Sequence, residues 1–437
     1  MIRFALTLAA FIGLAGPGQA AVDIQEVTTP AGITAWLVEE DSVPFTALEL
    51  RFRGGGSLDR DGKRGAINLM TATLEEGAGD LDAQGFAIAR DNLATSLRFD
   101  VNRDSLSVSA RFLTENRDEA MALLKLALTE PRFDEAAIER VRAQILSGLR
   151  SDENDPNTIA GLTLNGIIYG DHPYATSLDG TLESVAALTR EDVLNAYGDV
   201  IVKDRVYVGA TGDISADELA ALLDELLGDL PTGGAPLPET VNVDTTGGIT
   251  VEALDVPQSV ALFGHSGIPR DDPDFFAAFV ANEVFGGSGL TSRLSQEVRE
   301  ARGLTYGIGS YLVNFEYAHL MLGQFATANN RVEEAIDVVR AEWGKVAAEG
   351  VTQEELDAAK TYLTGAYPLR FDSNASIARI LVGMQIDGLP IDYIETRNSK
   401  VEAVTLDDVK RVVRRLYRPE DLRFVVVGQP DGLDGVN

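Results

Sequence analysis

The chain has 437 residues, 45% of them hydrophobic, which is enough for two or more domains with their own cores and too apolar for a disordered protein. Its formal net charge is −31, and it contains no cysteine. The acidity argues against a nucleic-acid partner and against an anionic membrane surface, and the missing cysteines exclude disulfides and thiolate chemistry.

Residues 1–20 have the pattern of a secretory signal peptide. Arg3 supplies a positive start, and residues 4–14 form an apolar run that is too short to span a bilayer. Small residues surround a cleavage position after Ala20. No later segment is apolar over the roughly 18 residues that a membrane helix requires. We therefore expect a mature chain that is exported and soluble, and the short, simple signal favours the periplasm.

The first half mixes strand-like and helix-like segments. Residues 94–101 and 106–112 flank a polar turn, and the second of them alternates apolar and polar side chains, so they predict a β-hairpin. Residue spacing and start signals predict helices over residues 115–129, 134–149, 157–169 and 190–197. Residues 231–248, rich in proline and glycine and without periodicity, have linker composition.

The second half repeats the first. Residues 188–193 match residues 404–409, and Gly212 matches Gly428, each glycine ending a predicted strand. Because such matches recur in order at a nearly constant offset, they indicate a duplicated domain of roughly 200 residues. We predict an α+β fold with antiparallel sheets covered by helices, present in two copies. The N-terminal copy spans residues 21–230 and the C-terminal copy residues 249–437.

The second copy is expected to contain a helix and a strand that belong to a binding site. Residues 290–302 carry apolar side chains at helical spacing, and Gly303 follows as the end of that helix. Residues 304–312 then alternate as a strand. Further along, residues 318–327 predict another strand and residues 332–349 another helix.

Arg299 lies late in this predicted helix, and Tyr306 lies early in the predicted strand. A helix followed by a strand lets both side chains point into one cleft. The guanidinium and the phenol hydroxyl are donors that suit a peptide carbonyl, or the oxyanion formed when that carbonyl is attacked. The alternative is a solvated Arg299 and a core aromatic Tyr306.

The string VFGGSGLTSRLSQEVREARGLTYGIGS, residues 284–310, closely resembles the C-terminal domain of the M16 metallopeptidases, which include pitrilysin, insulin-degrading enzyme and mitochondrial processing peptidase. The duplication, the linker and residues 170–180 resemble the family as well, so the resemblance spans essentially the whole mature chain. It implies that Arg299 and Tyr306 bind substrate, although Val298 replaces the family's usual leucine. It also implies that a glycine-rich loop lines the peptide cavity, where a flexible turn is the simpler alternative: Gly286, Gly287, Ser288 and Gly289.

The zinc-binding motif of the family is missing. Active members carry H-x-x-E-H on a helix of the first domain and a further glutamate downstream, and these positions correspond here to Asn68, Thr71, Ala72 and a place near Gly148. Neither a histidine pair nor a cysteine is available as a substitute ligand. The resemblance therefore implies no metal or other cofactor on this chain. The histidines are better explained by local structure: His172, His265 and His319.

A retained Arg299 and Tyr306 together with a lost zinc motif imply a non-catalytic, substrate-binding subunit of a heterodimeric M16-type zinc peptidase. Its partner subunit would carry H-x-x-E-H and the zinc, and its ligand would be a peptide. In the absence of that partner, a homodimer of this chain is possible. Two alternatives stay open. One is a catalytically inactive binding or structural protein, like the core subunits of respiratory complexes, and the other is a peptidase with a metal site outside the family pattern.

Overall fold

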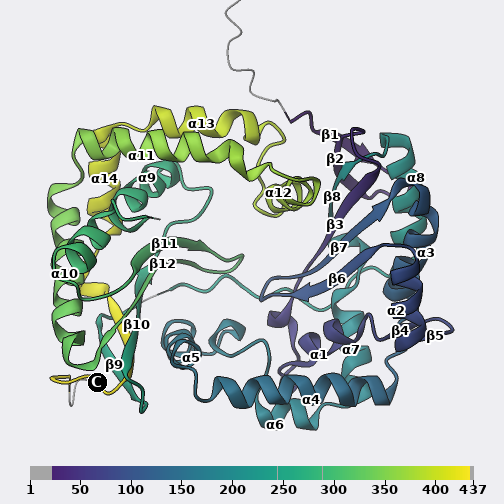
Figure 1. Cartoon of the computed structure of the whole chain (residues 1–437), viewed down its shortest axis with the longest axis horizontal. Coiled ribbons are helices and arrows are strands. Elements are labelled where there is room, and N and C mark those ends of the chain that lie inside the picture. The colour runs from purple at the N-terminus through teal and green to yellow at the C-terminus, as the bar shows by residue number, and fades with distance from the viewer. Residues whose placement is uncertain (1–21, 244, 288, 434–437) are drawn as a thin grey trace, which may run out of the picture.

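The computed structural model describes residues 22–243, 245–287 and 289–433, so the expected signal peptide, residues 1–20, lies outside the described residues. Two β-sheets lie on opposite sides of the molecule, and helices run along its rim (Figure 1). We call residues 22–230 the first half and residues 248–433 the second half.

The sheet of the first half has the order β1-β2-β8-β3-β7-β6. All neighbouring strands are antiparallel except β2 and β8, which are parallel. The strands are β1 (Gln25–Thr28), β2 (Thr34–Glu39), β3 (Phe45–Arg53), β6 (Ser96–Val101), β7 (Ser105–Leu113) and β8 (Val206–Gly212). A small separate hairpin is made of β4 (Gly77–Ala78) and β5 (Leu81–Asp82).

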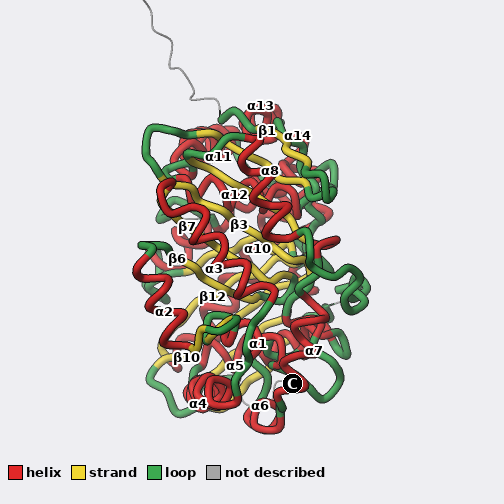
Figure 2. Tube along the Cα trace, turned by 90° about the vertical axis from the view of Figure 1, so that its right-hand side faces the viewer, coloured by secondary structure: helices red, strands yellow, loops and turns green. Residues whose placement is uncertain are grey.

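The helices of the first half pack mainly on one side of this sheet, where α2 and α3 lie in front of β6 and β7 (Figure 2). The helices are α1 (Ala66–Thr73), α2 (Ala83–Asn92), α3 (Arg117–Thr129), α4 (Glu135–Asp152), α5 (Pro156–Tyr169), α6 (Leu182–Ala187), α7 (Arg190–Val200) and α8 (Ala216–Leu227). The hairpin and the helices predicted from residue spacing are confirmed, with ends that differ by a few residues.

The sheet of the second half has the order β9-β13-β10-β12-β11, with β9 and β13 parallel and the other pairs antiparallel. The strands are β9 (Gly248–Ala253), β10 (Gln258–Ser266), β11 (Ile308–Asn314), β12 (His319–Ala328) and β13 (Arg423–Gly428). The helices are α9 (Phe275–Gly286), α10 (Val332–Glu349), α11 (Gln353–Ala366), α12 (Asn374–Ile386), α13 (Tyr393–Ala403) and α14 (Leu406–Leu416).

The two halves share one topology. If β1 is set aside, β2-β8-β3-β7-β6 corresponds strand for strand to β9-β13-β10-β12-β11. The helices that follow the central hairpin also correspond, from α3 to α7 and from α10 to α14. The duplication and the α+β class predicted from the sequence are therefore confirmed.

The repeated motif before the last strand of each half has a local physical reason. Thr189 and Thr405 are the N-caps of α7 and α14, and each accepts a hydrogen bond from the backbone of the third helical residue. That residue is Asp192 or Asp408, whose carboxylate accepts the backbone N–H of the threonine in return. Such a capping box satisfies two of the free N–H groups at a helix start, so the same short motif begins the same helix in both halves.

One helix of each half packs on the sheet of the other half. Helix α12 packs on β8 and β3 of the first half, and α5 packs on β10 and β13 of the second half. These are corresponding helices on corresponding strands. Leu381 of α12 is completely buried, and Leu164 of α5 is 1% exposed. Because each exchanged helix covers the inner face of the opposite sheet, the halves are held together by apolar cores as well as by the chain.

The apolar side chains form two large clusters, one from each half, and two smaller ones that cross between the halves through α5 and α12. Residues 231–247, apart from residue 244, contain neither helix nor strand. Among the described residues, no helix is both long and apolar enough to span a bilayer.

Candidate functional site

Arg299 and Tyr306 lie on the surface near the end of the sheet of the second half. Arg299 belongs to a π-helical segment, η5 (Ser295–Glu300), and its side chain is 37% exposed beside Glu300, with 3.3 Å between Nε and Oε1. Tyr306 lies in the loop before β11, and the residue is 88% exposed. The alternative that Tyr306 is a core aromatic is therefore wrong.

The predicted helix over residues 290–302 is shorter and wider than expected. Only residues 293–300 are helical, and from Ser295 onward the helix is π-helical. The N–H of Ala301 reaches back five residues to the carbonyl of Gln296, at 2.9 Å. Side chains also donate hydrogen bonds to carbonyls of the preceding loop: Ser295 Oγ donates to Gly289 O at 3.0 Å. These side-chain donors compete with backbone N–H groups for the loop carbonyls, which explains why an ordinary α-helix does not start at residue 290.

The helical segment ends at Glu300, two residues before the predicted end, and Gly303 follows it with a left-handed backbone. Its φ is +59°, its N–H donates to Arg299 O at 2.8 Å, and the next N–H, of Leu304, donates to Val298 O at 2.9 Å. The bond from Gly303 to Arg299, made around a left-handed residue, is that of an αL C-cap. The cap turns the chain sharply between Arg299 and Tyr306.

The predicted strand over residues 304–312 begins later, at Ile308. Thr305 Oγ1 donates to Ala326 O at 2.7 Å, and Thr327 Oγ1 donates to Leu304 O. Threonine hydroxyls thus occupy carbonyls that a regular β-ladder would use. The result is a short loop before the strand, and Tyr306 projects from it into solvent.

The glycine-rich loop connects α9 to this segment, and one of its members, Ser288, lies outside the described residues. Gly286 touches β11, because a Cβ there would lie 2.1 Å from Ser310 Oγ. Gly289 has φ +112° with open space around it. Gly286 is therefore required by close packing and Gly289 by backbone conformation, whereas Gly287 lies against Glu283 of the preceding helix turn.

The positions of the zinc motif lie on α1, and their side chains do not fit a zinc ion. Asn68 Nδ2 donates to Asp179 Oδ1 at 2.8 Å, and the buried Thr71 donates to Ile67 O at 2.8 Å. Ala72 is exposed and has no donor atom. Gly148 on α4 is exposed with open space around it. Among the described residues, no group of three or more His, Cys, Asp or Glu side chains is placed to hold a metal ion.

The histidines serve local structure, as the sequence indicated. His265 is fully buried, its Nδ1 lies 2.6 Å from Ser266 O, and its Nε2 accepts Trp343 Nε1 at 3.1 Å. His172 Nδ1 accepts the N–H of Tyr174 at 3.2 Å, and His319 Nδ1 lies 3.0 Å from Asn314 Oδ1.

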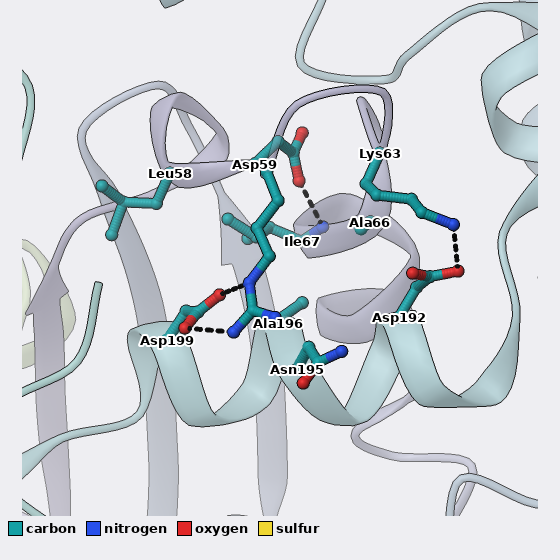
Figure 3. Close-up of a pocket in the computed structure, with 10 residues that line it drawn as sticks. Leu58, Asp59, Lys63, Ala66, Ile67, Asp192, Asn195, Ala196 and Asp199 are labelled. Atoms are coloured by element: carbon teal, nitrogen blue, oxygen red, sulfur yellow. Dashed lines mark hydrogen bonds and ion pairs between the residues drawn. The ribbon is translucent and has the colours of Figure 1, made fainter. Parts of the chain in front are cut away.

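A pocket beside α1 is not a ligand site (Figure 3). Its volume is about 10 Å³, which is room for roughly one water molecule. Arg60 Nε lies 2.8 Å from Asp199 Oδ2, and Lys63 Nζ lies 2.9 Å from Asp192 Oδ2. These ion pairs fasten the loop before α1 to α7.

A cavity of about 780 Å³ lies between the two halves and is lined by charged side chains of both signs. The turn of the β6–β7 hairpin meets the turn of the β11–β12 hairpin at its edge. Arg53 forms an ion pair with Glu316 across the halves, and Asp104 accepts the N–H of Glu316 at 3.1 Å. Neither Arg299 nor Tyr306 is among the residues that line this cavity.

Aromatic rings stabilise the same junction. The Arg103 guanidinium lies 5.1 Å from the ring centre of Phe315 and 5.5 Å from that of Tyr174. Tyr174 donates its hydroxyl to Asp104, and burial together with that carboxylate raises the pKa of Tyr174 well above its ordinary value. Sequence reasoning did not identify these residues as neighbours, because the segments that carry them are far apart in the chain.

The comparisons with known proteins agree with this fold. Residues 187–363 match the family described as Peptidase M16 inactive domain. The chain is 29% identical over 434 residues to the non-peptidase homolog YmxG of Helicobacter pylori, covering 98% of each chain. It is 22% identical over 410 residues to a Bacillus subtilis protein named uncharacterized zinc protease YmxG, covering 94% of this chain and 99% of the other. A crystal structure of a peptidase M16 inactive domain from Pseudomonas fluorescens superimposes with a TM-score of 0.88 at 28% identity, covering 93% of this chain and 98% of that one.

Proposed function

We propose that this chain, a member of the M16 peptidase family without the family's zinc-binding motif, is the substrate-binding subunit of a heterodimeric zinc peptidase. Its partner is a second M16 chain that carries H-x-x-E-H and the zinc. This chain supplies Arg299 and Tyr306 to hold the peptide backbone near the bond that the partner cleaves. We further propose that the pair works in the periplasm, to which residues 1–20 direct this chain.

The exposure of Tyr306 is the observation that carries this proposal. A residue that is 88% exposed contributes little to the stability of the isolated chain, yet a defined cap at Gly303 and the hydroxyl of Thr305 fix the loop that presents it. Tyrosine and arginine are favoured binding residues because each offers a large contact surface with a polar end. A peptide held against the partner chain would cover that ring.

The side chains at the zinc-motif positions support a role without chemistry of its own. Thr71 is buried and its hydroxyl donates a hydrogen bond to the helix backbone, and Ala72 offers no ligand atom. No step of peptide hydrolysis is therefore assigned to this chain. The name of the H. pylori relative, a non-peptidase homolog, is consistent with that division of labour.

The test is peptide hydrolysis by the purified mature chain, alone and mixed with an H-x-x-E-H-bearing M16 protein of the same cell, both with zinc present. We expect hydrolysis only in the mixture, together with a heterodimer in size-exclusion chromatography. Hydrolysis by the chain alone would refute the assignment. A stable heterodimer whose activity equals that of the partner alone would favour a binding or structural role.

The proposed location is tested separately by fractionating cells that produce the full chain. We expect the protein in the periplasmic fraction, shortened by about the length of residues 1–20. A full-length chain in the cytoplasmic fraction would contradict the export proposal and leave the subunit proposal standing.

A further inference from the structure

A second cavity, of about 330 Å³, lies in the second half beside α12. Its walls come from α9, the 3-10 turn η7 (Tyr367–Arg370), α12 and α13, with Leu312 and Asn314 of β11. Its size suits a small organic group or the last one or two residues of a peptide. No sequence motif pointed to it.

The charge of this cavity is opposite to that of the chain. The whole sequence has 68 acidic residues against 37 lysines and arginines. The cavity nevertheless gathers Arg270, Arg370 and Arg397, and among the described residues that line it only Asp387 is acidic. Within the described part of the chain, none of these guanidinium groups forms an ion pair with a carboxylate. Such a local excess of cations favours an anionic ligand.

Arg397 gives the clearest sign that a negative charge is missing. The residue is only 6% exposed, and its guanidinium donates to Leu363 O at 2.7 Å and to Asn398 Oδ1 at 2.9 Å. It also lies 4.5 Å from the ring centre of Tyr367. These partners are all neutral. A buried cation without a counter-charge is costly, so an anion that enters the cavity relieves that cost.

Arg270 is held in a similar way. Its guanidinium lies 4.2 Å from the ring centre of Phe275 and donates to the hydroxyl of Tyr393. Ring and hydroxyl together orient the planar fork. Burial raises the pKa of Asp387 and Arg270 lowers it in part, so Arg270 has a partial counter-charge that Arg397 lacks. Arg370 is exposed at the mouth of the cavity. The three guanidinium groups thus differ in mobility, with two held by neighbours and one exposed to solvent.

Much of the remaining wall is apolar. Phe276, Phe279, Met384 and Leu389 line the cavity, and Gly383 leaves open space where a side chain would stand on α12. A ligand that fits must therefore combine one anionic group with an apolar body. A free carboxylate next to an aliphatic side chain has this chemistry.

The cavity adjoins the larger one between the halves. Arg270, Asn314 and Asp387 line both. The larger cavity is lined by charged and amide side chains, which suit the polar backbone of a peptide better than a hydrocarbon chain. A ligand that leaves the small cavity in this direction would therefore be a peptide and not a fatty acid.

We propose that this cavity binds the free C-terminal carboxylate of a peptide whose last side chain is apolar. Arg370 and Arg397 face the carboxylate, the aromatic and aliphatic walls receive the last side chain, and the rest of the peptide runs into the cavity between the halves. This site is separate from Arg299 and Tyr306, which do not line it. It stands whether or not the chain pairs with a zinc-bearing partner.

The experiment measures fluorescence anisotropy of an N-terminally labelled peptide ending in Ala-Ala-Leu, titrated with the mature chain alone. The peptide is made once as the free acid and once as the C-terminal amide. We expect the acid to bind at least about tenfold more tightly, because charged hydrogen bonds to guanidinium groups are lost in the amide. Equal affinity of the two peptides, or no saturable binding of the acid below about 1 mM, would overturn the proposal.

Two variants locate the binding in this cavity. Arg370→Gln changes an exposed residue, and it should reduce acid binding about tenfold while leaving the weak amide binding unchanged. The matched control is Arg414→Gln on α14, also exposed and outside both cavities, which should change neither. Acid binding that is the same in both variants would overturn the proposal.

Gly383→Leu tests the cavity without removing a charge. A leucine there fills open space on a helix with ordinary backbone geometry, so the chain should keep its thermal stability while the acid peptide loses binding. Gly365→Leu on α11, an exposed position with equally open space, is the control and should bind normally. A chain that binds oleate tightly but not the acid peptide would overturn the assignment to a peptide.

Discussion

At the scale of single residues, the surrounding protein treats Arg299 and Tyr306 differently. Arg299 is tethered, since its Nε lies 3.3 Å from Glu300 on the same π-helical segment. Tyr306 has no comparable packing, and its loop alone sets its position. In the proposed role, a substrate would draw Arg299 from an exposed ion pair, which costs little, and would order the side chain of Tyr306.

The first prediction concerns this pair. In the reconstituted heterodimer, Arg299→Ala or Tyr306→Phe should lower kcat/KM about 10²-fold, because each removes a donor to the substrate carbonyl or oxyanion. The measurement is peptide hydrolysis, with assembly checked by size-exclusion chromatography.

Matched controls come from neighbouring residues of the same type. Arg302→Ala removes an exposed arginine whose partner is Glu297, and Tyr311→Phe alters a tyrosine on β11 that is 40% exposed. Both should leave turnover near the unmodified rate. Turnover unchanged in the Arg299 and Tyr306 variants would refute their roles.

The second prediction concerns Gly303, whose φ of +59° belongs to the left-handed region. Gly303→Ala should destabilise the chain by about 1 kcal/mol and reduce activity of the pair by displacing Tyr306. Denaturant unfolding measures the first effect. Gly307→Ala is the control, because Gly307 has open space and no left-handed backbone, and an equal loss there would contradict the explanation.

The third prediction concerns His265. Burial lowers its pKa to about 4 from an ordinary value of 6.5, and Trp343 donates to the ring nitrogen that a proton would occupy. The stability that the neutral ring provides is complete above pH 6.5 and is lost as the pH falls from 6.5 toward 4. The loss is of the order of 3 kcal/mol.

Denaturant unfolding at pH 7 and at pH 4.5 measures this effect. His265→Gln removes the titrating group, so the unfolding free energy of the variant should fall less over that interval than that of the unmodified chain. The same fall in both proteins would show that other groups cause it.

At the scale of elements, the exchange of α5 and α12 packs each half against the other. Each helix belongs to one half in sequence and to the other in packing. Trp36 and Val38 of β2 form an apolar cluster with Leu381 and Met384 of α12. Neither sheet keeps both of its faces covered if the halves separate, so we expect the chain to unfold in one transition.

The fourth prediction follows from this packing. Leu381→Ala should reduce the free energy of unfolding by about 2–5 kcal/mol, because Leu381 is completely buried between α12 and the opposite sheet. Leu369→Ala, at a side chain that is 76% exposed, should change it by less than about 0.5 kcal/mol. Urea unfolding followed by tryptophan fluorescence and by circular dichroism provides the measurement. Transitions at different urea concentrations would contradict the coupling of the halves.

At the scale of the whole molecule, a net charge of −31 disfavours nucleic acids and acidic surfaces as partners, yet several arginines line the cavities. Four of them, Arg51, Arg53, Arg103 and Arg270, line the space between the halves together with several carboxylates. The outside and the inside of the molecule therefore present different charges to a ligand.

The fifth prediction concerns metal removal. Because the side chains on α1 do not fit zinc, incubation of the isolated chain with EDTA should leave its Tm unchanged, and dialysis after added zinc should leave far less than one ion per chain. Differential scanning calorimetry and elemental analysis check these outcomes. One tightly held zinc per chain would contradict the division between the subunits.

The sequence alone was enough to predict the class, the duplication and five of the helices: α3, α4, α5, α7 and α10. Their signals are local: the threonine and aspartate of a capping box lie three residues apart, and the alternation of residues 106–112 lies within one strand. The changes at Asn68, Thr71 and Ala72 were also visible, since ligand chemistry depends on residue type. The roles of Arg299 and Tyr306 remain predictions.

Only the tertiary structure decided how these pieces combine. The late start of the helix depends on Ser295 binding a carbonyl of the preceding loop, and the late start of β11 depends on Thr305 in the loop before it and on Thr327 of β12. Two further features join segments that are far apart in the chain. One is the exchange of α5 and α12, and the other is the cavity that brings together Arg270, Arg370 and Arg397. Such contacts arise from burial of apolar surface across the whole chain, which no short stretch of sequence encodes.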